Sequence, residues 1–377
     1  MPRVKNRTFR SRDTALTFLN FTVKGDNLRA GLRRALAECD RLAGLSNVVR
    51  QTFFLAEAEV RGDVELTLVE LCGETRPVTT YILQPPAEGE PVGAELWAFP
   101  PGAVSVQSEH TAVAALGGLT WGFVGGLETG AEDGPHAGIC RLLGLAQREL
   151  QHSGLQFRQV VRTWYYVGDI LGPAADGTRY HEANRARNEF YPGKWPDLRQ
   201  TPASPGIGMN GRDVAFEGLA VADNPDARRV VWIDNPLQTP PCNYAPPGDQ
   251  KASPSFSRAA AVMLPACTVV FVSGTASIRA SDVVAAGDAR SQTQVTIENI
   301  ATVLSSDNLV GRHGLPRGGT LQDFQQFRVY VKRADDLAVV REACQRLLPP
   351  VPSAYLLADV CRPECLVEIE GVAAFHV

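Results

Sequence analysis

The order of strand and helix patterns in the second half of the chain repeats the order in the first half. In the second half, an apolar strand with a glycine turn precedes a helix, a strand, a second helix and two closing strands, at residues 268–278, 288–304, 327–332, 334–348, 353–360 and 365–375. Matching patterns occupy 119–128, 136–150, 159–170, 179–191 and 213–221. The sequence therefore predicts a duplicated α+β fold, in which each copy is a mixed sheet with helices packed on one face.

The repeat suggests where the copies begin and end. We place the first copy at residues 111–233 and the second, which carries the candidate site, at 257–377. Residues 234–256 between them are rich in proline, glycine and polar side chains, which is typical of a linker, and we expect this segment to act also as a lid. Residues 1–110 are interpreted as an N-terminal extension with first strands and without an assigned function. That extension contains a helix pattern and a strand-like pattern, at 26–44 and 63–73.

Composition excludes several classes of function. A net charge of −4 in 377 residues does not favour a basic groove for nucleic acid. No apolar run approaches the roughly 20 residues that span a bilayer, and the basic start is not followed by a secretory segment, so we expect a cytoplasmic protein that does not bind membranes. The eight cysteines are scattered without a CxxC pair, which argues against disulfides or a metal site. No cofactor is expected.

Two carboxylates lie in the apolar closing strand "LVEIEGVAAF". Strand alternation places Glu368 and Glu370 on the same face, although carboxylates are seldom buried without a partner. When the two copies are aligned, Glu370 corresponds to Glu217, whereas Glu368 corresponds to Ala215. A carboxylate present in both copies is most simply structural, and one present in a single copy is the better candidate for chemistry. We therefore predict that Glu368 is functional and that Glu370 is a possible second carboxylate beside it.

Several segments of the second copy resemble a known fold. They are "SPSFSRAAAVMLPACTVVFVSGTASI", "GDARSQTQVTIENIATVL" and "VEIEGVA", which are similar to the YjgF or reactive-intermediate deaminase fold, a group also labelled endoribonuclease L-PSP. The chain as a whole, over roughly residues 115–375, resembles the chorismatases. That second likeness depends on "WYYVGDI", "RYHEANRARNEFY", "PASPGIGM", "NPLQ" followed by "SPSFSRA", and "AYLLADVCRPECLVEIEG".

The resemblance implies a fold, an activity and an assembly. The fold would be two tandem YjgF-like, or chorismate-mutase-like, units. The activity would be hydrolysis of the enol-pyruvyl ether of chorismate to pyruvate plus a dihydroxycyclohexadiene or hydroxybenzoate product, in which a glutamate of the last strand, here Glu368, is the acid. An apolar strand environment would raise the pKa of Glu368 so that it holds its proton. YjgF-like proteins are typically trimeric, so the resemblance also implies a homotrimer.

A small dianion such as chorismate needs cationic clamps, and arginine is the expected residue type. The candidate substrate-binding residues are Arg185, Arg187, Tyr244, Lys251, Arg258, Gly274, Tyr355 and Arg362. In the related deaminases an arginine of the penultimate strand binds the substrate carboxylate, and the matching position here is Tyr355, which argues against imine deamination. The chorismatase linker pattern YxYPxxYGPRSPSFARA is altered to "CNYAPPGDQKASPSFSRA", in which Tyr244 occupies a tyrosine position and Lys251 replaces the arginine.

Two alternatives remain open at this point. The altered linker, with one tyrosine missing and Asp249 added, is compatible with a non-catalytic or regulatory binder of small anions on the same fold. The deaminase likeness keeps a YjgF-type imine deaminase as a further alternative.

Overall fold

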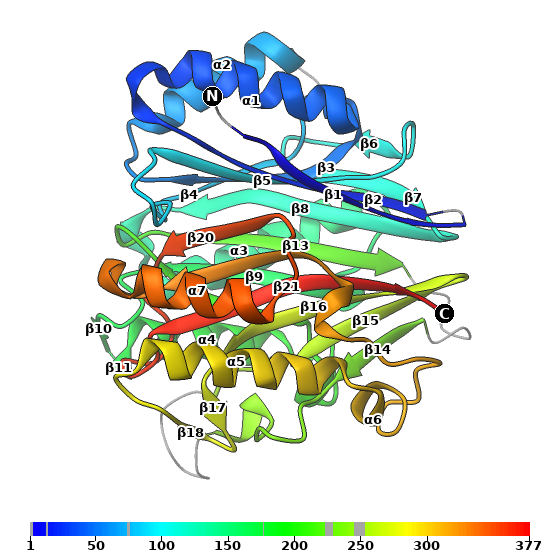
Figure 1. Ribbon diagram of the computed structural model, residues 1–377, viewed down its shortest axis with the longest axis vertical. Coiled ribbons are helices and arrows are strands. Elements are labelled where there is room, and N and C mark those ends of the chain that lie inside the picture. The colour runs from blue at the N-terminus through cyan, green and yellow to red at the C-terminus, as the bar shows by residue number, and fades with distance from the viewer. Residues whose placement is uncertain (1–2, 13, 74–75, 176, 223–228, 245–252) are drawn as a thin grey trace.

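The computed structural model describes residues 3–12, 14–73, 76–175, 177–222, 229–244 and 253–377. In this part of the chain, three large sheets lie one beside the other, each with helices on one of its faces (Figure 1). The N-terminal sheet and its two helices, in blue and cyan, form the top of the molecule in that view.

The N-terminal sheet has the order β1-β2-β5-β3-β4. Its strands are β1 (Lys5–Ser11), β2 (Thr14–Val23), β3 (Val48–Leu55), β4 (Thr79–Ile82) and β5 (Val92–Ala98), and its helices are α1 (Leu28–Ala43) and α2 (Val60–Cys72). The helix predicted at 26–44 is confirmed as α1, whereas the strand-like pattern at 63–73 was wrong, because these residues form α2. Val64, Thr67 and Leu68 of α2 are buried at helical spacing, while the alternation of apolar and polar residues that suggested a strand leaves Leu66 exposed.

The second sheet has the order β12-β9-β13-β8-β7-β6 and the third has the order β14-β15-β16-β21-β19-β20. The second contains β6 (Val104–Val106), β7 (Thr111–Leu116), β8 (Leu119–Thr129), β9 (Val160–Gly168), β12 (Gly206–Met209) and β13 (Val214–Ala222), with α3 (Gly134–His152) and α4 (Arg179–Phe190). The third contains β14 (Val230–Ile233), β15 (Ala259–Leu264), β16 (Cys267–Ala276), β19 (Phe324–Val331), β20 (Ser353–Leu357) and β21 (Val367–His376), with α5 (Ala289–Leu304), α6 (Ser306–Leu309) and α7 (Leu337–Leu347). Two short hairpins complete the inventory: β10 (Pro173–Ala174) with β11 (Gly177–Thr178), and β17 (Ile278–Arg279) with β18 (Asp282–Val283).

The three large sheets share one connectivity. In each, the last strand lies between the second and third strands of a common five-stranded order: β1-β2-β5-β3-β4, β7-β8-β13-β9-β12 and β15-β16-β21-β19-β20. The predicted duplicated α+β fold is thus confirmed for the second and third sheets. The N-terminal residues, for which the sequence predicted no function, form a sheet of the same order.

Four apolar cores hold this arrangement together. Three of them lie between one sheet and its own helices, such as the cluster of α1 and α2 residues under the first sheet. The fourth lies where the sheets meet and contains aromatic residues of all three, including Trp97, Trp164 and Phe271. Trp97 packs against both of the others, with ring centroids 5.8 Å from Trp164 and 6.0 Å from Phe271. The helix-free faces of the three sheets are therefore buried against one another. Among the described helices, none has a long enough apolar run to cross a lipid bilayer.

Candidate functional site

The central core contains three glutamates at corresponding positions of the last strands. In the strand register, each glutamate pairs with a residue of the third strand of its own sheet. Each also accepts a hydrogen bond from an arginine that belongs to a different sheet. All six side chains are almost fully buried. The pairs are Glu217 with Arg50, Glu370 with Arg162, and Glu95 with Arg328.

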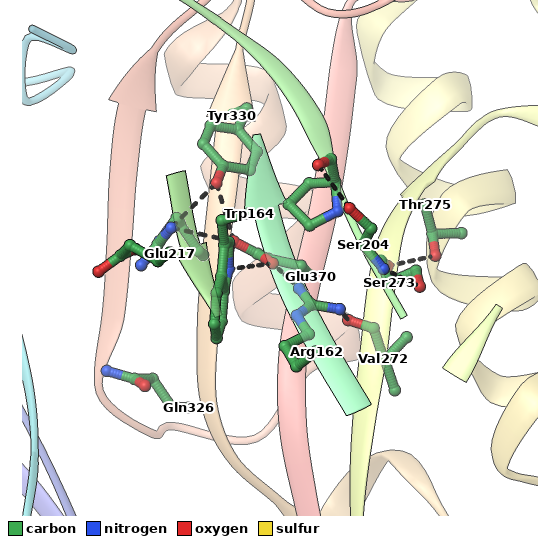
Figure 2. A network of polar contacts seen from close by, with 12 residues as sticks. Arg162, Trp164, Ser204, Glu217, Val272, Ser273, Thr275, Gln326, Tyr330 and Glu370 are labelled. Atoms are coloured by element: carbon green, nitrogen blue, oxygen red, sulfur yellow. Dashed lines mark hydrogen bonds and ion pairs between the residues drawn. The ribbon is translucent and has the colours of Figure 1, made fainter. Parts of the chain in front are cut away.

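Glu370 has the contacts of a structural carboxylate. Its oxygens accept hydrogen bonds from Arg162, from Trp164 Nε1 at 3.0 Å and from the Tyr330 hydroxyl at 2.8 Å (Figure 2). Its counterpart Glu217 is bound in a similar way, with Arg50 at 2.7 Å as its cationic partner. Burial raises the pKa of Glu217, but Arg50 and the other donors outweigh that effect, so the pKa lies below its usual value. These contacts support the expectation that Glu370 and Glu217 share a role in joining the sheets.

Glu368 has different surroundings. It lies two residues before Glu370 on β21, so strand alternation places both on the same face, and it is only 3% exposed. Among the described residues no hydrogen bond or ion pair reaches its carboxyl group. Burial raises the pKa of Glu368 to about 8, although the more distant charges of Arg162 and Arg258 pull it down. A carboxyl group of this kind is neutral at pH 7 and can donate a proton.

The backbone opposite Glu368 is shaped to admit it. The pairing of β16 with β21 shifts between Val272 and Thr275, and Gly274 lies in this irregular stretch. A Cβ atom on Gly274 would stand 1.9 Å from Glu368 Oε1 and 2.9 Å from the Cβ of Pro205. Only glycine therefore leaves space for the carboxyl group at this point. Pro205 belongs to the segment before β12, so Glu368 lies at the junction of the second and third sheets.

Cationic and phenolic groups from the linker side approach the same junction. Arg258 is 3% exposed and donates to the Thr239 carbonyl at 2.9 Å and to the Tyr244 hydroxyl. Its Nε is buried without a hydrogen-bond partner. Arg362 stacks over the Tyr244 ring at 4.7 Å from the centroid. Contacts or electrostatic interactions thus link five of the predicted residues, which are Glu368, Gly274, Arg258, Tyr244 and Arg362.

Other predicted residues lie elsewhere or have other contacts. Arg187 is buried, stacks on the Tyr165 ring and donates to the Ser255 carbonyl at 2.6 Å, so it fastens α4 to the linker. Arg185 forms ion pairs with Glu182 and Glu189 on its own helix. Lys251 lies outside the described residues, as do residues 245–252 of the predicted lid as a whole.

Tyr355 does not meet Glu368. It lies on β20, where the guanidinium of Arg341 stacks over its ring and where the third sheet meets the first. The penultimate strand that faces Glu368 is β12 of the second sheet. Tyr165 of β9 and Val329 of β19 occupy corresponding positions, because each directly follows the residue opposite the core glutamate of its sheet. Gly206 pairs with Tyr165, and Tyr355 pairs with Val329. Gly206 is therefore the counterpart of Tyr355 at the candidate site.

Two residues near Glu368 were not predicted from the sequence. Tyr180 lies at the start of α4 and Cys361 lies before β21, and the two are neighbours. Burial raises the pKa of the Cys361 thiol most, and the charge of Glu368 raises it further. Both residues lie inside motifs that carried the family resemblance, "RYHEANRARNEFY" and "AYLLADVCRPECLVEIEG". Those motifs indicated the family but not which of their members turn toward the carboxyl group.

Comparisons with known proteins give consistent results. No protein-family profile matches the chain. A 3-hydroxybenzoate synthase from Streptomyces hygroscopicus is 37% identical over 224 residues, which cover 57% of this chain and 64% of that protein. A chorismatase from Streptomyces rapamycinicus is 37% identical over 224 residues, which cover 58% of this chain and 65% of that protein. The alignments thus span just under two thirds of the length of these two relatives.

A third relative is matched over more of its length. A chorismatase from Streptomyces hygroscopicus is 32% identical over 267 residues, which cover 68% of this chain and 74% of that protein. A crystal structure described as a chorismatase at 1.08 Å resolution superposes with a TM-score of 0.72 at 24% identity and covers 97% of this chain and 100% of its own. At that identity the superposition shows the fold alone, and it includes the N-terminal sheet.

Proposed function

The chain belongs to the chorismatase family, and from this premise we propose that it hydrolyses the enol-pyruvyl ether of chorismate or a closely related acid. The products are pyruvate and a dihydroxycyclohexadiene acid or, after this ring acid loses water, a hydroxybenzoate. The observation that carries the proposal is the buried Glu368 carboxyl, which has no hydrogen-bond partner among the described residues and whose raised pKa of about 8 keeps it protonated at pH 7.

The chemistry follows from that proton. Glu368 protonates the methylene carbon of the enol ether, which leaves a positive charge shared between the ether carbon and oxygen. Water adds to that carbon and loses a proton, which restores the acid form of Glu368. The hemiketal then breaks its bond to the ring oxygen, which takes up the hemiketal hydroxyl proton, and pyruvate is released. Arg258, with its unpartnered Nε, and Arg362 are proposed to bind substrate carboxylates. Tyr244, held between these two arginines, is proposed to orient them.

Incubation of the purified protein with chorismate tests this function directly. Pyruvate should accumulate with time, measured by a coupled lactate dehydrogenase assay, and a ring product should appear by chromatography. Absence of pyruvate above the blank would refute the proposal and would favour the alternative of a small-anion binder. A coupled assay for loss of an imine or enamine substrate addresses the third alternative, a YjgF-type deaminase.

The raised pKa predicts the pH dependence of turnover. Because the protonated form of Glu368 is the reactive one, kcat should fall as pH rises through about 8, with a limiting slope of about tenfold per pH unit. An initial-rate series from about pH 6 to about pH 10 measures this, with protein stability checked in the same buffers. A kcat that increased over this range would contradict the role of Glu368 as an acid.

Gly274 offers a test of the space around the acid. The methyl group of Gly274→Ala would collide with Glu368 Oε1, so the carboxyl group must move, and a displacement of this size is expected to lower kcat about 10²-fold. Gly193→Ala is the matched control, because a Cβ there meets no atom within 4 Å. Equal activity in the two variants would remove Gly274 from the proposed site.

Assembly and location complete the proposal. We expect a cytoplasmic protein without affinity for nucleic acid, in keeping with the net charge of −4, and a homotrimer, as in YjgF-like proteins. Light scattering that gave a mass near 40.7 kDa would contradict the trimer. The packing of three sheets inside one chain would then account for a monomer, because the helix-free faces are already covered.

A further inference from the structure

Cavities lie at the junction of the third and first sheets and at the junction of the first and second. In each last strand, the position two residues before the core glutamate lies at one of the three junctions between the sheets. It is Glu368 at the junction of the second and third sheets, Ala215 at the junction of the first and second, and Gly93 at the junction of the third and first. Only one of these three positions therefore carries an acid.

A cavity lies between the third and first sheets. It has a volume of about 610 Å³, which lies in the range of small-molecule sites. Its walls come from β1, β2 and β5 on one side and from β19, α7 and β20 on the other. The two sides are joined by backbone contacts, which include a hydrogen bond from Ala87 N to the Tyr355 carbonyl at 2.9 Å.

The strand register places a cation here at the position that Arg258 has in the candidate active site. Lys5 of β1 pairs with Asn20 of β2, which itself pairs with the core glutamate Glu95. In the third sheet, the strand register is irregular between Val272 and Thr275, the stretch of β16 that lies across from Glu370. Ser273 in this stretch donates its backbone N–H to the Arg258 carbonyl, so Arg258 lies beside the residue across from Glu370. Lys5 is thus the counterpart of Arg258, just as Gly93 is the counterpart of Glu368.

The charges lining this cleft are more positive than negative. Arg3, Lys5 and Arg341 line it together with Glu88 and Glu90. Glu88 is paired with Arg341, and Glu90 accepts a hydrogen bond from the Thr22 hydroxyl at 3.3 Å. Partial burial and the neighbouring Arg341 and Arg3 lower the pKa of Lys5. Lys5 therefore lies close enough to Arg341 and Arg3 to be repelled by both, and a bound anion relieves this repulsion.

The remaining wall of the cleft is apolar and partly aromatic. Phe54, Phe327 and Tyr355 line it, and Arg341 stacks over the Tyr355 ring at 4.7 Å from the centroid. A ligand that fills such a space has a flat apolar body and an acidic group directed at Lys5.

We propose that the cleft between the third and first sheets binds a small carboxylic acid with a flat apolar body and does not transform it. Lys5, Arg3 and Arg341 hold the carboxylate, and the Tyr355 side holds the ring. Because Gly93 replaces the acid, the cleft has no proton donor where Glu368 provides one. The site does not depend on the proposed hydrolysis, although a hydroxybenzoate serves as a suitable probe for both clefts.

Calorimetric titration with 3-hydroxybenzoate tests the proposal through the number of molecules bound by each chain. The wild-type protein should bind two, one in each cleft. Lys5→Met should weaken one of the two about tenfold or more, because it removes a charged partner of the carboxylate. Arg258→Met should weaken the other, and the double variant should bind neither. Lys24→Met is the matched control, since Lys24 is exposed and does not line the cleft, and it should leave both sites intact.

The outcomes separate this proposal from the proposed function. A wild-type protein that binds a single molecule, lost in Lys5→Met but kept in Arg258→Met, supports the second cleft and counts against the catalytic one. A single molecule lost only in Arg258→Met, unchanged binding in Lys5→Met, or no binding by the wild-type protein overturns the second cleft. Melting temperatures of all variants, measured without ligand, establish that each is folded.

Discussion

Glu368→Gln is expected to lower kcat by about 10² to 10⁴-fold, the usual contribution of a general acid. Glutamine keeps the size of the side chain and fits the same space beside Gly274, but it cannot give up a proton as a carboxylic acid does. Binding of the substrate depends on other groups, so stabilisation of the variant by chorismate in a thermal melt should survive. Steady-state kinetics together with ligand-induced melting shifts measure the two effects separately.

A neighbouring glutamate provides the control for that substitution. Glu364 is exposed at the loop that leads into β21, so Glu364→Gln should retain wild-type kcat. If Glu368→Gln turned over chorismate at the wild-type rate, the acid would have to be another group. The pH dependence described above should also disappear in Glu368→Gln, which distinguishes loss of the acid from a general disturbance of the cleft.

Glu370→Gln is expected to act on stability, with a loss of about 3–5 kcal/mol in the free energy of unfolding. The substitution leaves the Arg162 guanidinium buried without its carboxylate, and it also weakens the hydrogen bonds from Trp164 and Tyr330. Urea denaturation followed by tryptophan fluorescence measures the loss. Glu217→Gln, which leaves Arg50 in the same situation, should have a similar cost.

A double-mutant cycle identifies the cause of that loss. If the unpaired charge is responsible, Arg162→Met combined with Glu370→Gln should cost less than the sum of the two single substitutions. A stable Glu370→Gln protein without turnover, beside an active Glu368→Gln protein, would exchange the roles of the two carboxylates.

The sequence predicted the part of the site that repetition reveals. Alignment of the two recognisable copies set Glu370 against Glu217 and Glu368 against Ala215, and the ion pairs of Glu370 and Glu217 agree with that comparison. The N-terminal sheet was not recognised, because its likeness to the others lies in strand order and register rather than in shared motifs. The arginine that binds Glu217 comes from that sheet, so this partner could not be anticipated.

The position of Tyr355 shows a second limit of the sequence. A motif indicates the strand on which a residue lies, but not the neighbour that the strand faces. Each cleft combines the last strand of one sheet with the penultimate strand of another, so Glu368 meets the segment of β12 and not β20 of its own sheet. Counting back along the chain from Glu368 therefore leads to the wrong junction.

The exchange of ion pairs among the sheets has a consequence for how the chain can be divided. Glu217 depends on Arg50 of the first sheet, Glu370 on Arg162 of the second, and Glu95 on Arg328 of the third, so the dependence closes on itself. Arg328 and Glu370 of the third sheet also pair with each other at 3.2 Å. Removal of the first sheet therefore leaves the Glu217 carboxylate without its arginine, removal of the second leaves the Arg50 guanidinium without its carboxylate, and removal of the third leaves both Glu95 and Arg162 unpaired in an apolar interior. No sheet can be excised as an autonomous module, and truncation at either end should dismantle the whole protein rather than shorten it.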